Sequence, residues 1–181
     1  MTKEKLILDR EAPILREQAK PVDLKEIGSK RLANIISKMK EAVHAEDDGV
    51  AIAAPQIGES LRLFVVKGEA LALAAEGKLD PEKELQDLVF INPEIIKVSQ
   101  KKSKMEEGCL SLRYLYGHVL RHNKATIKAY NEEGKLLSVG ASGLLAQIFQ
   151  HEIDHLNGVL FIDKAENVKD VPPVKNVSTK N

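Results

Sequence analysis

A six-residue segment near the C-terminal end, QHEIDH at 150–155, restricts this chain more than any other feature. On an α-helix, residues four apart differ by about 40° in direction, so His151 and His155 project from the same face. Two imidazoles at this spacing can hold one metal ion, and Glu152 borders the same face without having to be a ligand, as suits a general base. The segment therefore predicts a metal site on a helix.

The neighbouring residues predict that this helix is buried. We expect it from about residue 142 to residue 157, ended by Gly158. Apolar side chains cover most of its other directions: Leu144, Leu145, Ile148, Phe149, Ile153 and Leu156. Burying histidines and carboxylates there costs free energy unless they are paired or bind a metal. Core histidines hydrogen-bonded to carboxylates are the alternative, but spacing and burial favour a metal.

Two histidines leave such a site incomplete, because catalytic metal sites of this kind use a third protein ligand and keep one position open. In familiar zinc metalloproteases that ligand lies downstream, where the acidic candidates are Asp163, Glu166 and Asp170. Upstream, the single cysteine, Cys109, follows Gly108 at the end of an expected strand. Thiolate is a strong ligand for zinc or ferrous iron, although a lone cysteine is more often a small buried hydrophobe. The residues alone leave both ligand types open.

The rest of the chain alternates a second helix with short strands. Apolar residues at three- and four-residue steps predict an amphipathic helix from about Ser29, a possible cap, to Ala45. The small apolar segment 49–58 is broken by Pro55 and predicts an extended segment or loop, and 68–88 a surface excursion with one or two helical turns. Strands are expected at 61–66, 89–98, 103–107, 118–121, 125–130 and 136–141. We expect an α+β fold, with short, mostly antiparallel strands in small sheets around a buried central helix that carries HExxH.

The length of 181 residues predicts a single domain at 1–165, followed by a polar tail at 166–181. Lys+Arg and Asp+Glu both number 27, so no basic excess favours a nucleic-acid surface, and we expect no direct nucleic-acid site. One cysteine cannot form an internal disulfide, and no segment approaches the roughly 20 apolar residues of a membrane span. We expect a cytoplasmic protein without membrane contact, with a monomer as the default.

Three segments, in this order along the chain, resemble the peptide deformylase family: GVAIAAPQ at 49–56, EGCLS at 107–111 and QHEIDHL at 150–156. The similarity spans roughly residues 5 to 163, and the last two motifs are highly specific in combination. The excursion at 68–88 resembles the longer variant of the family found in Gram-positive bacteria. The resemblance implies a hydrolase that removes the formyl group from N-formylmethionyl peptides and releases formate. The substrates it implies are nascent chains at the ribosome.

The resemblance also implies roles for individual residues. Glu152 would be the catalytic acid/base, while Gln56 and the backbone N–H of Leu110 would stabilise the oxyanion. Ferrous iron, Fe²⁺, is the metal of the family, and Zn²⁺, Ni²⁺ or Co²⁺ can occupy the site. The implied metal ligands are Cys109, His151 and His155.

Substrate binding should follow from the same layout. Leu144 and Ile148 lie on the metal side of the expected helix and would floor an apolar pocket for a methionine side chain, with plain core packing as the alternative. The rest of a peptide would bind by strand addition against the backbone around Val50 and Ala51.

Two residues depart from the family pattern. Ala51 stands at the position of the second glycine of the first motif. If this position needs a positive φ, alanine costs about 1 to 2 kcal/mol there; if the glycine provides space, the alanine methyl group enters the cleft. Arg113 stands where the family usually has proline. With Tyr114 and Tyr116 it would reshape the cleft rim or contact a polar substrate end, or else belong to a solvated patch. The alternative functions are a non-catalytic deformylase-like binding protein and a zinc peptidase using the same helix.

Overall fold

The computed structural model describes residues 6–74 and 85–172, and its strands form two antiparallel sheets. The larger sheet has the order β1-β2-β3-β6-β7. Its strands are β1 (Ala51–Ala53), β2 (Leu63–Val66), β3 (Leu88–Val98), β6 (Lys124–Tyr130) and β7 (Leu136–Ser142). The smaller sheet has the order β4-β5-β8, with β4 (Lys102–Gly108), β5 (Leu115–His122) and β8 (Glu166–Asp170).

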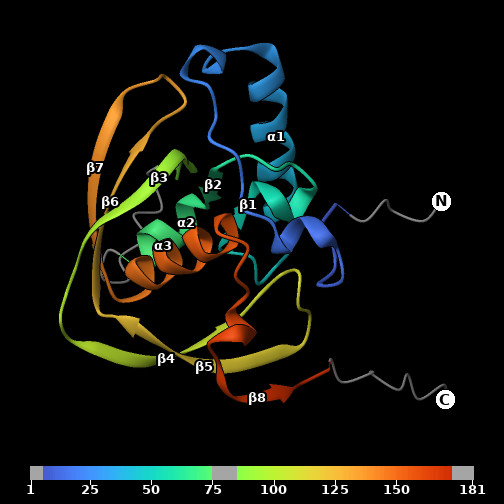
Figure 1. Cartoon of the computed structure of the whole chain (residues 1–181), viewed down its shortest axis with the longest axis vertical. Coiled ribbons are helices and arrows are strands. Elements are labelled where there is room, and N and C mark those ends of the chain that lie inside the picture. Colours follow the sequence, from blue (N-terminus) through green and yellow to red (C-terminus); the bar gives the residue numbers. More distant parts are fainter. Residues whose placement is uncertain (1–5, 75–84, 173–181) are drawn as a thin grey trace, which may run out of the picture.

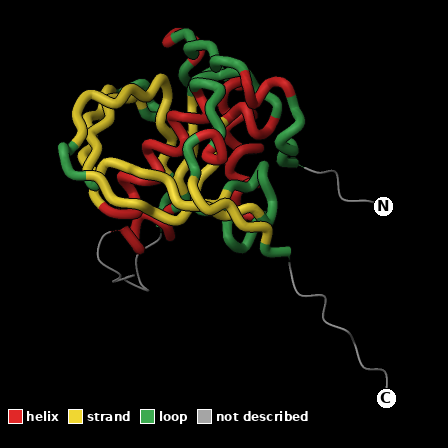
Figure 2. Tube along the Cα trace, turned by 60° about the horizontal axis from the view of Figure 1, so that its bottom comes forward, coloured by secondary structure: helices red, strands yellow, loops and turns green. Residues whose placement is uncertain are grey.

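Three α-helices accompany the sheets in the described part of the chain: α1 (Lys30–His44), α2 (Gly68–Ala74) and α3 (Gly143–Leu156). Short 3₁₀ turns lie at Pro13–Arg16, Leu24–Glu26, Ala54–Ile57 and Phe161–Asp163. The expected excursion at 68–88 begins with α2, and residues 75–84 lie outside the described residues. In the rotated view the strands curve around helical segments at the centre (Figure 2).

Helix α1 forms where its sequence pattern predicts it. The Ser29 hydroxyl accepts a hydrogen bond from the N–H of Leu32 at 3.1 Å, so the expected N-cap is confirmed. Its apolar face is fully buried and packs against β1 and β2 through residues such as Ile36 and Met39. This packing closes one side of the larger sheet.

Helix α3 lies between the two sheets (Figure 1). Phe149 packs edge-on to Phe90 with ring centroids 5.3 Å apart, and Phe64 completes this aromatic group on the inner face of the larger sheet. After Leu156 the chain turns at Gly158, whose φ is +73° and where a Cβ would lie 2.6 Å from the Arg16 carbonyl oxygen. The expected α+β fold with a buried helix carrying the two histidines is therefore confirmed.

The end of the described chain belongs to the smaller sheet. β8 pairs with β5, with Leu115 opposite Asp170 and His118 opposite Glu166. The sheet thus continues beyond residue 165, where the sequence places the start of the polar tail. None of the described helices is long and apolar enough to cross a membrane.

Candidate active site

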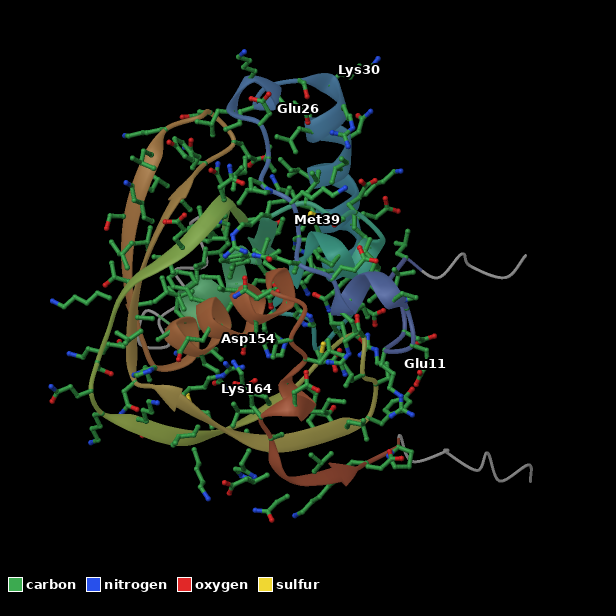
Figure 3. All side chains as sticks on the ribbon, in the orientation of Figure 1. Glu11, Glu26, Lys30, Met39, Asp154 and Lys164 are labelled. Carbon is green, nitrogen blue, oxygen red and sulfur yellow. The ribbon has the colours of Figure 1, made fainter. Side chains whose placement is uncertain are left out.

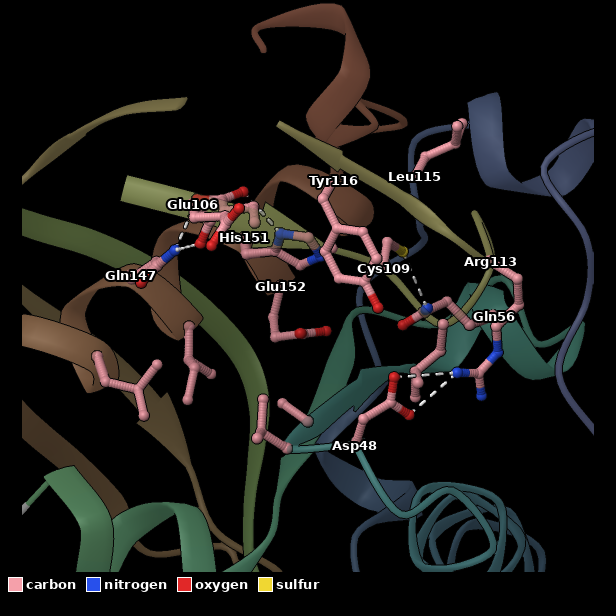
Figure 4. Close-up of a pocket in the computed structure, with 18 of the residues that line it drawn as sticks. Asp48, Gln56, Glu106, Cys109, Arg113, Leu115, Tyr116, Gln147, His151 and Glu152 are labelled. Atoms are coloured by element: carbon pink, nitrogen blue, oxygen red, sulfur yellow. Dashed lines mark hydrogen bonds and ion pairs between the residues drawn. The ribbon is translucent and has the colours of Figure 1, made fainter. Parts of the chain in front are cut away.

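A cysteine and two histidines from different elements meet beside α3. His151 and His155 project from one side of the helix, with ring centroids 4.9 Å apart, and Cys109 follows directly after β4. The Cys109 Sγ lies 3.2 Å from Nε2 of His155, and one donor atom from each of the three residues lies within 4.8 Å of the others. Figure 4 shows Cys109 and His151 at the pocket, with Glu152 beside them. The structure therefore brings the upstream sulfur to the two imidazoles.

The three downstream carboxylates do not join this group. Asp163 accepts from Arg16 at 2.5 Å, and Glu166 pairs with Lys104 at 2.6 Å. Asp170 lies in β8 opposite Leu115. Among the described residues, no carboxylate joins the cysteine and histidines as a possible third ligand. The zinc-peptidase alternative, which needs such a carboxylate, receives no support from this geometry.

The chemistry of the donor set fits a divalent transition metal. Burial alone would raise the pKa of the Cys109 thiol, but the neighbouring His155 and His151 outweigh it and lower the pKa to about 5. The sulfur is then a thiolate at neutral pH, which is the form that coordinates metals. One thiolate and two imidazoles suit zinc or ferrous iron.

A buried carboxylate orients the first histidine. Glu107 Oε2 lies 3.0 Å from Nδ1 of His151, so the Nδ1–H can donate to it and leave Nε2 as the free lone pair. Arg121 donates to both Glu107 oxygens, at 2.7 and 2.9 Å. Burial would raise the pKa of Glu107, but the bonds from Arg121 and His151 lower it to about 2. The sequence pattern does not single out Glu107, although this residue begins the EGCLS motif.

Arg121 and Lys164 both form ion pairs with Asp154 of α3. Arg121 donates to Asp154 Oδ2 at 2.6 Å, and Lys164 donates to Asp154 Oδ1 at 2.7 Å. Asp154 and Lys164 lie close together below α3 in Figure 3. Asp154 thus pairs with Arg121 and Lys164 and is not grouped with the metal-binding candidates.

Glu152 lies in the pocket without a protein partner for one of its oxygens. The residue is buried, and its Oε2 atom has no hydrogen-bond partner in the described structure. Burial is the largest influence on the Glu152 carboxyl and raises its pKa, although His151 and His155 act in the opposite direction. An unpartnered carboxylate beside a possible metal site is suited to accept a proton from a bound water or substrate.

Two hydrogen-bond donors face the same region. The side chain of Gln56 is fixed, because its Oε1 accepts from the Ala53 N–H at 2.9 Å. Its Nε2 lies 3.2 Å from Ser111 Oγ and 3.6 Å from Cys109 Sγ, so the amide presents its N–H groups to the cysteine side. Leu110 also lines the pocket, and its backbone N–H has no acceptor within the described part of the chain.

These groups line a cavity of about 280 Å³. Its apolar wall includes all four residues expected to bind substrate: Val50, Ala51, Leu144 and Ile148. Ala51 lies in β1 and is not among the residues with positive φ, so its methyl group meets the cleft and its backbone is not strained. β1 is an edge strand of the larger sheet, pairing only with β2 there.

Arg113 lies at the rim of this cavity. Its guanidinium forms ion pairs with Asp48, at 3.0 Å, and with Glu46. These ion pairs join the loop after Cys109 to the loop after α1, and Figure 4 shows the pair with Asp48. These ion pairs place the Arg113 side chain at the rim beside exposed carboxylates, and both a role in shaping the cleft and a place in a solvated patch stay predictions. Tyr116 also lines the cavity, with its ring so close to Gly108 that a Cβ there would lie 2.8 Å from it.

Comparisons with known proteins agree with this geometry. The family model described as polypeptide deformylase matches residues 4–171. A peptide deformylase of Halothermothrix orenii is 45% identical over 157 residues, which cover 86% of this chain and 90% of the relative.

Two solved structures are also similar. The class I type b peptide deformylase from Acinetobacter baumannii, bound to Met-Ala-Ser, is 31% identical with a TM-score of 0.76 and covers 91% of this chain and 99% of its own. The peptide deformylase from Synechococcus elongatus, in complex with actinonin, is 33% identical with a TM-score of 0.75 and covers 92% of this chain and 82% of its own. With its cysteine and two histidines beside a buried glutamate, this chain belongs to the polypeptide deformylase family.

Proposed function

We propose that this chain is a metal-dependent hydrolase that removes the formyl group from N-formylmethionyl peptides and releases formate. One observation carries the proposal: the donor atoms of Cys109, His151 and His155 converge beside the buried carboxylate of Glu152 in an apolar cleft. A solved relative from Acinetobacter baumannii is bound to Met-Ala-Ser, the product expected from a formylated tripeptide. The catalytic unit extends through β8 to Asp170, and the substrates are nascent chains at the ribosome in the cytoplasm, where the enzyme acts as a monomer.

In this proposal the metal is ferrous iron, held by Cys109, His151 and His155, and zinc, nickel or cobalt can replace it. A bound divalent ion lowers the pKa of water and polarises a carbonyl oxygen. The thiolate gives the site more negative charge than a third neutral histidine would. Glu107 keeps the His151 ring in the orientation that leaves Nε2 free.

Glu152 moves the proton. Its carboxyl group is buried and one of its oxygens has no protein partner, so it can accept the proton of the attacking water. The raised pKa brings this group closer to neutral pH, so the acid form can then deliver the proton to the departing amine. Proton uptake and delivery by the same oxygen need no second catalytic acid.

Gln56 and Leu110 stabilise the oxygen that becomes negative as water attacks the formyl carbon. The Gln56 amide is held by Ala53 with its N–H groups toward Cys109, and the Leu110 N–H has no acceptor among the described residues. Donors fixed before the reaction stabilise developing charge without reorganisation.

The peptide binds along the edge of the larger sheet. The main chain adds as a strand beside Val50 and Ala51, because β1 has an unpaired edge. Leu144 and Ile148 form the apolar floor for the methionine side chain. Recognition of the main chain tolerates many sequences after the methionine.

Formate release from formyl-Met-Ala-Ser tests this function. Freshly prepared ferrous protein, kept anaerobic, should hydrolyse the peptide, and exposure to air should abolish the activity because iron with a thiolate ligand oxidises. Absence of turnover with iron, nickel, cobalt and zinc would favour a protein that only binds formylated peptides. The Cys109→Ala variant should lose metal affinity, and an unchanged affinity would point to a different third ligand.

A further inference from the structure

We infer that Tyr114 forms an aromatic subsite at the rim of the cleft and selects an apolar side chain at one of the two residues that follow formylmethionine. This inference rests on the proposed function and adds a determinant of substrate preference to it. It starts from the backbone of Tyr114, whose φ is +68°. Residues other than glycine rarely adopt this conformation, and those that do are mostly Asn, Asp or His.

The surrounding contacts force this conformation. The Tyr114 carbonyl accepts a hydrogen bond from the N–H of Val171 at 2.8 Å, just past β8. The next residue, Leu115, donates to the Leu112 carbonyl at 3.1 Å and begins β5. On the other side of Tyr114, Arg113 forms an ion pair with Asp48. Strained backbone persists where such neighbours over-determine it, and it gathers at ligand-binding sites.

Intramolecular packing does not account for an aromatic side chain at this point. Tyr114 is 43% exposed and lines the cleft. A glycine would satisfy the same backbone without strain. The tyrosine ring therefore offers exposed apolar area to a molecule bound in the cleft.

The position of the ring indicates which part of the substrate covers it. The formyl group must lie at Cys109, and the methionine side chain lies over Leu144 and Ile148 on α3. Tyr114 lies five residues after Cys109, on the exposed rim, so it meets a later residue of the peptide. The neighbouring guanidinium of Arg113 is paired with two carboxylates, so this part of the rim selects for apolar surface and not for negative charge.

The test compares kcat/KM for formyl-Met-Phe-Ser and formyl-Met-Ala-Phe with that for formyl-Met-Gly-Gly. We expect the wild-type protein to favour one of the two phenylalanine peptides by about 3- to 10-fold, the effect of one aromatic contact. This preference should fall to about one in Tyr114→Gly and in Tyr114→Ala, and persist in Tyr114→Phe. The peptide that shows the preference identifies the residue that Tyr114 contacts.

Thermal unfolding separates this role from a structural one. Glycine accepts a φ of +68°, so the unfolding temperature of Tyr114→Gly should not fall, whereas Tyr114→Ala keeps the strain of the wild-type residue and should unfold at a lower temperature than Tyr114→Gly. Asn167→Gly is the matched control, because Asn167 has a φ of +55° in β8 and does not line the cleft. That variant should keep the wild-type preference.

Two results would overturn the inference while the proposed function stands: a wild-type enzyme with no preference among the three peptides, or an unchanged preference in Tyr114→Gly. A Tyr114→Gly variant that unfolds several degrees earlier and loses activity equally on all three peptides would show that the ring is a packing residue. If the wild-type protein hydrolyses none of the peptides with any metal, the proposed function fails and this subsite fails with it.

Discussion

Replacing Arg121 by methionine should destabilise this protein and weaken its metal site together. Arg121 is 3% exposed and is the counter-ion of Glu107, which it contacts through two nitrogens at 2.7 and 2.9 Å. Methionine has a similar length but no charge, so Glu107 would remain buried without its cation. Asp154 would keep its contact with Lys164 at 2.7 Å, so the loss of Arg121 would destabilise its charge less than that of Glu107.

The pKa of Glu107 gives the size of this effect. Despite burial, Arg121 and His151 together lower this pKa from 4.5 to about 2, which corresponds to about 3 kcal/mol at 1.36 kcal/mol per pH unit and sets an upper bound on the share of Arg121 in this shift. Removing one partner of a buried ion pair typically costs about 3–5 kcal/mol, which agrees with this value. Because the pKa is lowered in the folded state, the stabilisation is complete above about pH 4.5 and disappears as the pH falls toward 2.

Urea unfolding in the presence of a chelator measures the free energy without bound metal. Arg121→Met should lose up to about 3 kcal/mol at pH 7, and the difference from the wild-type protein should shrink below pH 4.5. The control is Arg31→Met, because Arg31 pairs with Glu26 at 2.7 Å on the surface and should lose less than about 1 kcal/mol. Chelator competition should show metal affinity about 10- to 100-fold lower in Arg121→Met, since His151 loses its firmly held partner. Equal stability losses in the two variants, or a loss in Arg121→Met that does not change with pH, would refute this reasoning.

Three further predictions concern the site and the turn after α3. Gln56→Ala should lower kcat/KM for formyl-Met-Ala-Ser by about 100- to 1,000-fold, because one aimed donor is removed, and near-normal turnover would contradict that role. Glu152→Gln should retain metal, measured by elemental analysis, but lose nearly all formate release; metal loss together with activity would make Glu152 a ligand. Gly158→Ala should lower the free energy of unfolding in urea by more than about 1 kcal/mol, because its φ is +73° and the new Cβ would meet the Arg16 carbonyl at 2.6 Å. A stability change below a few tenths of a kcal/mol would show that this turn relaxes freely.

Local sequence patterns determined the parts of the protein whose partners lie within one helix or one turn. The four-residue spacing of His151 and His155 places both rings on one face of any α-helix, and the apolar residues around them require that helix to be buried. The cap of α1 at Ser29 depends on a residue only three positions away. Such features follow from backbone geometry, so they were predictable without the fold.

Tertiary structure alone decided which distant groups meet. From the residues alone, two types of third metal ligand were possible. The end of β4 brings Cys109 to α3, while Asp163 and Glu166 form ion pairs elsewhere and Asp170 lies in β8. The contact of Glu107 with Arg121 depends on the register of β4 against β5, because a slip by one residue would turn either side chain to the other face of the sheet. The positive φ of Tyr114 likewise accompanies a hydrogen bond from a distant residue, the N–H of Val171 just past β8. These contacts join residues far apart in the chain, so they are set by how the sheets pack and not by any local preference.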